Sequence, residues 1–346
     1  MTATLAPASA AELAELLRAR SCAAVRVLGG GSRQARLPAP PPHATTVSLA
    51  RLCRVDRCEA DDLTCSVEPG LPRAELDALL WPLGLELPCA GAGTLGGLFA
   101  ADPIGASTPG GGSPRSLLLG LEGVLADGTT FKTGARVVKS VAGFDVHKLF
   151  VGSRGRLFAA TLLHLKLRPR PRDRADFACG GLDAAAALRL FAQLRHLPLP
   201  PSRLQLQRDG SGFTVCGQLV GRGSFVGASM RRLGLQAAAA AATDHLTAAD
   251  DLEVVAGLLL PSRLPGLLQA LPADAPLLLR GGGRFETVLP PVAADALLLA
   301  LPPLFGHGEI TAGAPARRGR STPLDAGAAR LGDGLRRALD PGGVLV

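Results

Sequence analysis

A glycine-rich loop directly after a β-type run constrains the fold of this chain more than any other feature. Residues 23–28 predict a strand, and this run ends in Gly29-Gly30-Gly31-Ser32. Consecutive glycines lack Cβ atoms, so several backbone N–H groups can turn toward one bound anion. A phosphate-binding loop is one interpretation of this segment. A plain surface turn is the other, because 43 of the 346 residues are glycine and triplets also occur elsewhere in the chain.

A second glycine-rich segment, Gly91-Ala92-Gly93-Thr94-Leu95-Gly96, has the spacing of a dinucleotide-binding fingerprint. That fingerprint needs a strand before it and a long helix after it. Pro88 allows only a very short strand before this segment, and Pro103 ends any helix within a few residues after it. A Rossmann NAD site is therefore disfavoured, whereas contact with another phosphate-bearing cofactor stays open.

The composition predicts a folded protein of the cytoplasm. Apolar residues make up 47% of the chain and charged residues 19%, enough to bury hydrophobic cores. The uncharged run 87–101 is too short and too rich in glycine to span a bilayer. No Lys or Arg precedes the apolar residues of 1–11, so we expect no cleaved signal peptide.

The charge and the cysteines limit the classes of partner and cofactor. The net charge of +8 favours an anionic ligand, but only 3% of residues are aromatic and no basic run occurs, so nucleic acid is disfavoured. No two of the seven cysteines have the two-residue gap of zinc and iron–sulfur sites. The cluster of Cys53, Cys58 and Cys65 lacks a fourth close ligand. We therefore expect no metal site, and redox chemistry would require an organic cofactor.

The pattern of elements predicts an α+β protein of two domains, residues 1–171 and 172–346, divided at the Pro/Arg-rich linker 168–174. The first domain is expected to contain a helix capped by Ser9 and Glu12, strands 45–49, 63–67 and 157–167, helices 72–80 and 145–151, and a hairpin of 117–125 with 129–133. The second is expected to form an antiparallel sheet with helices, namely strands 203–207, 213–219, 253–259 and two around 281–283, with helices 182–195, 229–242, 262–271, 291–301 and part of 323–338.

The segment 132–167 carries the most specific signal, because it holds all four lysines of a chain that otherwise uses arginine. Its sequences 137–145 (VVKSVAGFD) and 148–153 (KLFVGS) resemble the FAD-binding domain of the vanillyl-alcohol-oxidase type, also called the PCMH type. Within that family the chain is most similar to the FAD-binding E subunit of glycolate oxidase. The resemblance runs from about residue 20 to residue 171. It implies a two-domain fold, an FAD-binding PCMH-type domain followed by a smaller α+β domain.

The resemblance also implies FAD as the cofactor and a set of residues that contact it. Gly29 to Ser32 would be the pyrophosphate loop and Thr94 to Gly97 a second cofactor loop. The full implied set is Gly29, Gly30, Gly31, Ser32, Thr94, Leu95, Gly96, Gly97, Lys139, Gly143, Asp145, Gly152, Ser153 and Gly155. Relatives with covalent flavin have a histidine in the first loop, where this chain has Ser32, so we expect noncovalent FAD. Arg154, Arg156 and Phe158 depart from the family pattern and are expected to change contacts to FAD.

The resemblance implies an oxidoreductase subunit that oxidises a CH–OH group of a small 2-hydroxy acid by hydride transfer to flavin. It also implies two partners, a homologous FAD subunit and an iron–sulfur subunit. The alternative is a non-catalytic FAD-binding or structural subunit that supports a homologous catalytic partner, and an NAD-linked enzyme is a third possibility.

Candidate substrate-binding and proton-accepting residues lie mainly in the second half. The chain has no tyrosine, which excludes a phenolic base. His307, in the predicted loop 305–309, is our candidate for the catalytic base. His147 is interpreted as an exposed helix residue, and His164 as a structural residue of a strand. Arg280 and Arg284 could clamp the substrate carboxylate, but ordinary solvated arginines are the favoured interpretation of both.

Overall fold

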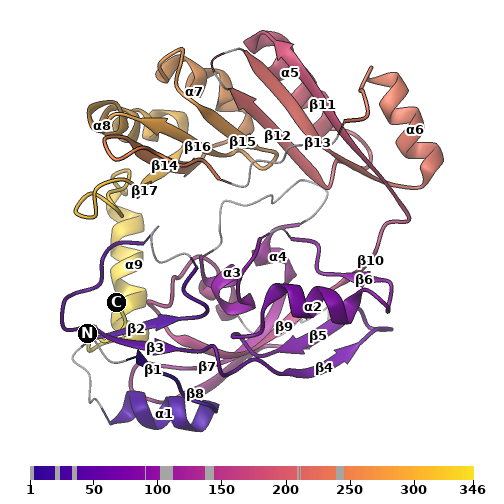
Figure 1. Cartoon of the computed structure of the whole chain (residues 1–346). Coiled ribbons are helices and arrows are strands. Elements are labelled where there is room, and N and C mark those ends of the chain that lie inside the picture. Colours follow the sequence, from indigo (N-terminus) through magenta and orange to yellow (C-terminus); the bar gives the residue numbers. More distant parts are fainter. Residues whose placement is uncertain are drawn as a thin grey trace.

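The computed structural model describes residues 4–19, 24–32, 37–89, 91–101, 112–136, 144–208, 210, 212–238 and 245–346. The chain folds into two lobes, of which the lower one in Figure 1 holds most of the N-terminal half. The upper lobe is built on one large sheet with helices on its outer side. This arrangement of helices and mostly antiparallel sheets is the α+β class that the sequence predicts.

A three-stranded parallel sheet carries the glycine-rich loop. Its strand order is β1 (Thr4–Leu5), β3 (Thr45–Ser48) and β2 (Val25–Leu28). Helix α1 (Ala10–Arg18) packs its leucines on the core below this sheet. The side chain of Ser9 accepts a hydrogen bond from the Glu12 N–H, which confirms the predicted helix start.

A five-stranded antiparallel sheet forms the rest of the lower lobe. Its order is β4 (Val55–Glu59), β5 (Thr64–Val67), β9 (Ala159–Lys166), β7 (Leu118–Val124) and β8 (Thr130–Gly134). The predicted hairpin is confirmed: Leu125 N–H donates to the Thr129 carbonyl, and Gly128 takes a φ of +82° in the turn. Helices α2 (Arg73–Leu80) and α3 (Leu95–Ala101) share a buried leucine-rich core with this sheet. Short elements complete the lobe, namely α4 (Pro114–Leu117), η2 (Val146–Phe150) and β6 (Leu85–Glu86), which pairs with β10 (Arg168–Pro169).

A seven-stranded antiparallel sheet forms the upper lobe, as predicted for the second domain. Its order is β11 (Asp173–Leu182), β13 (Phe213–Gly221), β12 (Arg203–Arg208), β15 (Leu277–Arg280), β16 (Arg284–Leu289), β14 (Glu253–Leu258) and β17 (His307–Ala312). One face packs its apolar side chains against helices α5 (Ala184–Arg195), α7 (Leu264–Ala270) and α8 (Pro291–Ala300). Helix α6 (Gly223–Arg232) lies beside the β11 end.

The structure corrects three predicted elements. The helix predicted over 229–242 is wrong, because α6 ends at Arg232 and Gly234 takes a φ of +62°. The linker 168–174 contains β10 and the start of β11, which pair with β6 and β13. The loop predicted over 305–309 is wrong from His307 onward, since β17 begins there. The two strands of the seven-stranded sheet that were not predicted, β11 and β17, lie at its edges and have only one fully buried apolar side chain each.

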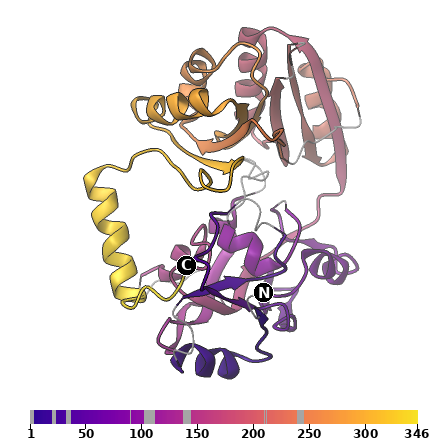
Figure 2. The same cartoon turned by 60° about the vertical axis from the view of Figure 1, so that its left-hand side comes forward.

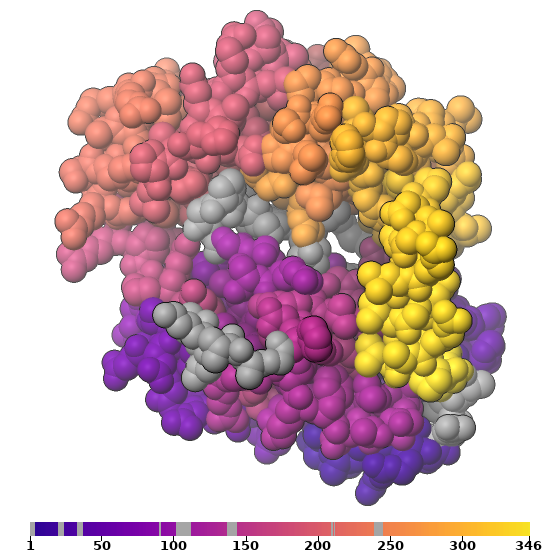
Figure 3. Space-filling view, turned by 180° about the vertical axis from the view of Figure 1, so that it is seen from behind, coloured from indigo at the N-terminus to yellow at the C-terminus, as the bar shows by residue number. Residues whose placement is uncertain are grey.

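The C-terminal residues return to the lower lobe. Helix α9 (Ala326–Leu339) runs from the upper lobe to the lower one along the outside of the molecule (Figures 2 and 3). The Asp340 carboxylate then accepts hydrogen bonds from the Val344 and Leu345 N–H groups, at 2.9 and 2.7 Å. Val346 N–H donates to the Val25 carbonyl on β2. The domain boundary at 171/172 stays a prediction, and these contacts tie residues 340–346 to the first domain.

No helix within the described ranges has both the length and the apolar character needed to cross a membrane.

Candidate cofactor site

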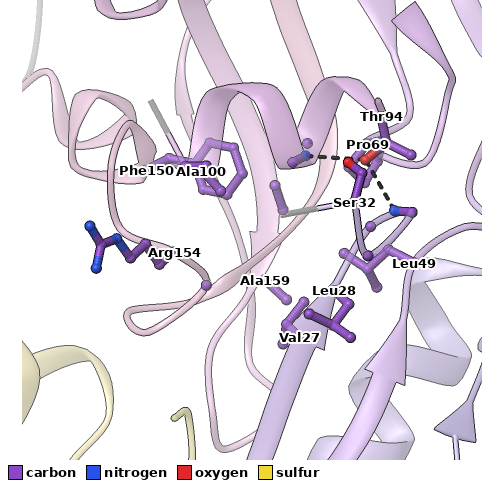
Figure 4. Close-up of a pocket in the computed structure, with 18 of the residues that line it drawn as sticks. Val27, Leu28, Ser32, Leu49, Pro69, Thr94, Ala100, Phe150, Arg154 and Ala159 are labelled. Carbon is purple, nitrogen blue, oxygen red and sulfur yellow. Dashed lines mark hydrogen bonds between the residues drawn. The ribbon is translucent and has the colours of Figure 1, made fainter. Parts of the chain in front are cut away.

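A pocket of about 700 Å³, partly open to solvent, lies between the glycine-rich loop, α3 and the segment 150–160. Strand β2 leads into it through Val27 and Leu28, and the loop at 29–32 forms one wall. Figure 4 shows Thr94 and Ser32 on one side of this pocket and Arg154 on the other. The pocket therefore gathers segments that are far apart in the sequence.

Two glycine-rich loops approach each other closely at one wall of the pocket. The Thr94 Oγ1 accepts hydrogen bonds from the Gly30 N–H at 3.4 Å and the Gly97 N–H at 3.3 Å (Figure 4). A Cβ on Gly29 would lie within 2.1 Å of the Thr94 Oγ1, and one on Gly96 within 2.6 Å of the Pro69 Cβ. These two glycines are required by packing. Gly31, at a φ of +73°, is required by the turn.

Aromatic side chains close the apolar side of the pocket. Phe158, fully buried, stacks on Phe150 with ring centroids 5.9 Å apart and meets Phe131 edge to face at 5.0 Å. Phe150, Phe158, Ala159 and Ala160 all line the pocket. This wall suits the apolar part of a ligand, whereas the loop at 29–32 suits its polar part.

Arg154 connects the pocket to the seven-stranded sheet. Its Nη1 and Nη2 donate to the two carboxylate oxygens of Glu309 on β17, at 2.6 and 2.5 Å. Only 27% of the Arg154 side chain and 15% of the Glu309 side chain are exposed, so the pair is well shielded from water. Arg154 also takes a φ of +56°, a left-handed conformation that is uncommon for a residue other than glycine. These two parallel hydrogen bonds hold the pocket wall against the second domain.

The structure brings most of the predicted cofactor residues together around the pocket. Eight of them line it, namely Gly29, Gly30, Gly31, Ser32, Thr94, Gly96, Gly97 and Gly155. Leu95 is buried in the core beneath α3, and Asp145 lies exposed before η2. Gly152 and Ser153 form the turn before Gly155, and the Ser153 Oγ accepts from the Gly155 N–H at 3.4 Å. Lys139 and Gly143 lie outside the described residues. The roles assigned to these residues stay predictions.

The three histidines singled out from the sequence lie in different surroundings. His307 is exposed at the start of β17, opposite Leu258 on β14, and its role as the base stays a prediction. The prediction that His147 is exposed is wrong, because its side chain is buried in η2, as is that of His164 in its strand. Burial lowers the pKa of each imidazole. The His164 Nδ1 lies 2.8 Å from the Ser66 Oγ within the five-stranded sheet.

The sheet face opposite α5, α7 and α8 is polar. Strand pairing places Gln205 beside Arg280, and Ala256 between Glu286 and Glu309, all on that face. Because Glu309 holds Arg154, this polar face is the one that is tied to the cofactor pocket.

A buried carboxylate organises the centre of that face. Glu286 is fully buried, accepts a hydrogen bond from the Leu246 N–H at 2.8 Å, and lies 2.9 Å from the His245 Nδ1 and 3.4 Å from the Arg280 Nη1. Burial alone would raise the pKa of Glu286, but the hydrogen bond from His245 and the charge of Arg280 outweigh it and lower this pKa. No local pattern in the sequence indicates the His245–Glu286 pair, whose members are 41 residues apart. Arg280 has 1% of its side chain exposed, so its interpretation as an ordinary solvated arginine is wrong, and its role as a substrate clamp stays a prediction.

Comparison with known proteins decides the class of the cofactor pocket. Residues 1–134 match a family model described as the FAD binding domain. Residues 1–134 are therefore similar to an FAD-binding domain. FAD is the cofactor that the sequence motifs imply, and the fold is the expected PCMH type.

Several curated proteins share this FAD-binding part. The chain is 32% identical over 167 residues to the probable mitochondrial D-lactate dehydrogenase of Danio rerio, a match over 47% of this chain and 34% of that protein. It is 32% identical over 148 residues to the glycolate oxidase subunit GlcE of Escherichia coli K12, over 41% of this chain and 42% of that protein. These matches therefore span less than half the length of either relative.

The whole chain shares its fold with a solved structure. An alkyldihydroxyacetonephosphate synthase superposes on 99% of this chain and 75% of its own length, with a TM-score of 0.71 and 14% identity. At this identity the likeness concerns the fold alone.

The residues of the pocket fit FAD. The glycines at 29–31 place backbone without Cβ atoms where a pyrophosphate can approach it, next to the loop at 94–97, and the Phe150–Phe158 wall suits an apolar ring system. Gly30 is exposed at the pocket, so a ligand can approach its backbone, whose N–H donates to the Thr94 Oγ1 in this structure. FAD would thus be held by this chain's own glycine loops.

Proposed function

We propose that this chain is an FAD-dependent oxidoreductase subunit that oxidises a small 2-hydroxy acid to the corresponding 2-oxo acid. The observation that carries the proposal is the Arg154–Glu309 contact, because it ties the polar face of the second domain to the cofactor pocket. The names of the D-lactate dehydrogenase and glycolate oxidase relatives support the substrate class. By resemblance, the partners are a homologous FAD subunit and an iron–sulfur subunit.

The protein's own contribution is to orient the substrate and to accept a proton. When bound, FAD supplies the acceptor for the hydride that leaves the alcohol carbon. The hydroxyl proton must then leave the substrate oxygen, so a base near that oxygen completes the balance of the reaction.

His245 is our candidate for that base. Its Nδ1 lies 2.9 Å from the buried Glu286 carboxylate, and 32% of its side chain is exposed. A carboxylate beside Nδ1 holds the proton on that nitrogen and leaves Nε2 as the acceptor. Glu286 would also stabilise the imidazolium after the proton is taken up. His307 is the second candidate, because it begins the strand that carries Glu309.

A supporting, non-catalytic role is the second candidate function. It is favoured by the contact of Arg280 with Glu286, since this guanidinium already faces a protein carboxylate. In that case the chain would bind FAD and stabilise a homologous subunit in which the substrate is oxidised.

Flavin reduction tests the proposal. The FAD-loaded chain is mixed with glycolate or D-lactate, alone and with its homologous FAD and iron–sulfur subunits, and the flavin absorbance near ~450 nm is followed. We expect slow reduction of the isolated chain and fast reduction in the assembled complex. His245→Gln should slow the reduction of this chain's flavin roughly 10²–10⁴-fold, the usual contribution of a general base.

A control variant and three opposing outcomes complete this experiment. His196→Gln, an exposed residue at the end of α5 on the helix side of the sheet, should leave the rate unchanged. Slow reduction only with His307→Gln would move the base to His307. An unchanged rate for both variants in a fully active complex would favour the supporting role, and no flavin reduction in any combination would overturn the substrate class.

A further inference from the structure

A second pocket adjoins the cofactor pocket and is lined by three arginines. It has about 350 Å³ of space and shares Leu37 and Arg154 with the first pocket. Its lining consists of Arg26, Leu37, Pro38, Ala39, Pro40, Pro41, Arg154, Arg156 and Val346. The pocket thus combines a rigid, proline-rich apolar wall with a cationic wall.

The positive charge of the cationic wall exceeds the negative charge of the carboxylates that pair with it in the described part of the chain. Glu309 neutralises Arg154 through two hydrogen bonds. Arg26, on β2, is 7% exposed and donates from Nη1 to the neutral carbonyl of Pro38 at 3.2 Å. The guanidinium of the half-buried Arg156 forms no hydrogen bond or ion pair with any residue in the described part of the chain. Two guanidinium charges therefore line the pocket beside one balanced pair.

The electrostatics show that these charges repel one another. Burial, followed by the charge of Arg156, lowers the pKa of Arg26. Burial lowers the pKa of Arg156 as well, with further contributions from Arg154 and from Arg336 on α9, against an opposing contribution from Glu309. Like charges in a partly desolvated pocket are unfavourable unless an anion joins them. One guanidinium group can donate two parallel hydrogen bonds to two oxygens of the same phosphate. A phosphate group is therefore the anion that matches this wall.

We propose that Arg26, Arg154 and Arg156 form a binding site for a phosphate group that is separate from the FAD pyrophosphate. The cofactor's pyrophosphate has its own N–H groups at 29–32 in the first pocket. The second pocket lies beyond Leu37 and Arg154, where the proline wall would contact the carbon part of a phosphate monoester. The inference depends on FAD occupying the first pocket and not on the oxidation of a hydroxy acid.

Phosphate binding to the FAD-loaded full chain tests this site. Inorganic phosphate and phenyl phosphate are titrated by calorimetry at constant ionic strength, because the charges at an exposed site are screened by salt. We expect saturable binding of one phosphate per chain. Tighter binding of phenyl phosphate would assign the site to monoesters, and equal or weaker binding would assign it to free phosphate.

Two variants move the affinity in opposite directions. Arg156→Met should weaken phosphate binding roughly tenfold or more, as expected for the loss of a charge-assisted hydrogen bond. Because it removes a repelled charge, this variant should keep or raise the melting temperature in the absence of phosphate. Glu309→Gln removes the charge that neutralises Arg154, while its side-chain oxygen can still accept a hydrogen bond from Arg154, and should strengthen phosphate binding.

The control is Arg232→Met, an exposed residue in the last turn of α6, which should leave the phosphate affinity unchanged. Binding that does not saturate, or that is equal in Arg156→Met and the wild type, would overturn the site. Phosphate binding to the FAD-free chain that disappears when FAD is added would also overturn it, because the phosphate would then occupy the position of the cofactor.

Discussion

Gly30→Val is expected to lower the FAD affinity of this chain at least tenfold while leaving the fold intact. An ideal Cβ at Gly30 would lie 3.3 Å from the Thr94 Cγ2 and would meet nothing closer, so the backbone can accept a side chain there. Gly30 is exposed at the pocket, however, and the methyl groups of valine would occupy the space in which a pyrophosphate reaches the backbone N–H. The measurement is the flavin content per chain after dialysis, together with FAD titration of the flavin-free protein.

Gly332→Val is the matched control. Gly332 lies in α9, and an added Cβ there meets no atom within 4 Å. Both variants should keep the circular dichroism spectrum of the wild type. Equal FAD affinity of Gly30→Val and Gly332→Val would place the pyrophosphate away from the loop at 29–32.

Arg280→Met is expected to reduce the free energy of unfolding by about 3–5 kcal/mol, which is the usual cost of removing one partner of a buried ion pair. Arg280 and Glu286 each have 1% of their side chains exposed, so the variant would remove a guanidinium from beside a buried carboxylate that also contacts His245 and the Leu246 N–H. Urea denaturation of the FAD-free protein measures this change.

Arg320→Met provides the comparison for an exposed ion pair. Arg320 pairs with Asp295 at 3.2 Å, and 56% of its side chain is exposed, so its loss should cost less than about 1 kcal/mol. If Arg280→Met and Arg320→Met lost the same free energy, the Glu286 network would not contribute to the stability of the second domain.

The sequence predicts those parts of the fold that depend on local patterns. The capped helix α1 and the hairpin of β7 and β8 each have a signal within a few neighbouring residues, a cap in one case and Asp127-Gly128 in the other. The antiparallel sheet of the second domain follows from its alternating strands. The glycine loops follow from their position after strands, and the structure brings them to one pocket.

The parts that the sequence does not predict depend on distant contacts. Arg154 and Glu309 are 155 residues apart, and His245 and Glu286 are 41 apart, so no local spacing indicates either pair. Strands β11 and β17 lie at the edges of their sheet, where alternation of apolar and polar residues is weak. The alanine run after α6 favours a helix by propensity, but the glycine at 234 with positive φ ends the helix before it.

The flavin content of the purified chain tests the central claim, that FAD binds noncovalently in the pocket formed by the two glycine loops. We predict about one FAD per chain, with an oxidised-flavin absorbance near ~450 nm. Acid precipitation should release this flavin into the supernatant, because the first loop has Ser32 and not a histidine to which flavin could be covalently attached. Flavin that remains with the pellet would contradict noncovalent binding. A chain that takes up no FAD, even when FAD is added in excess, would contradict the account as a whole.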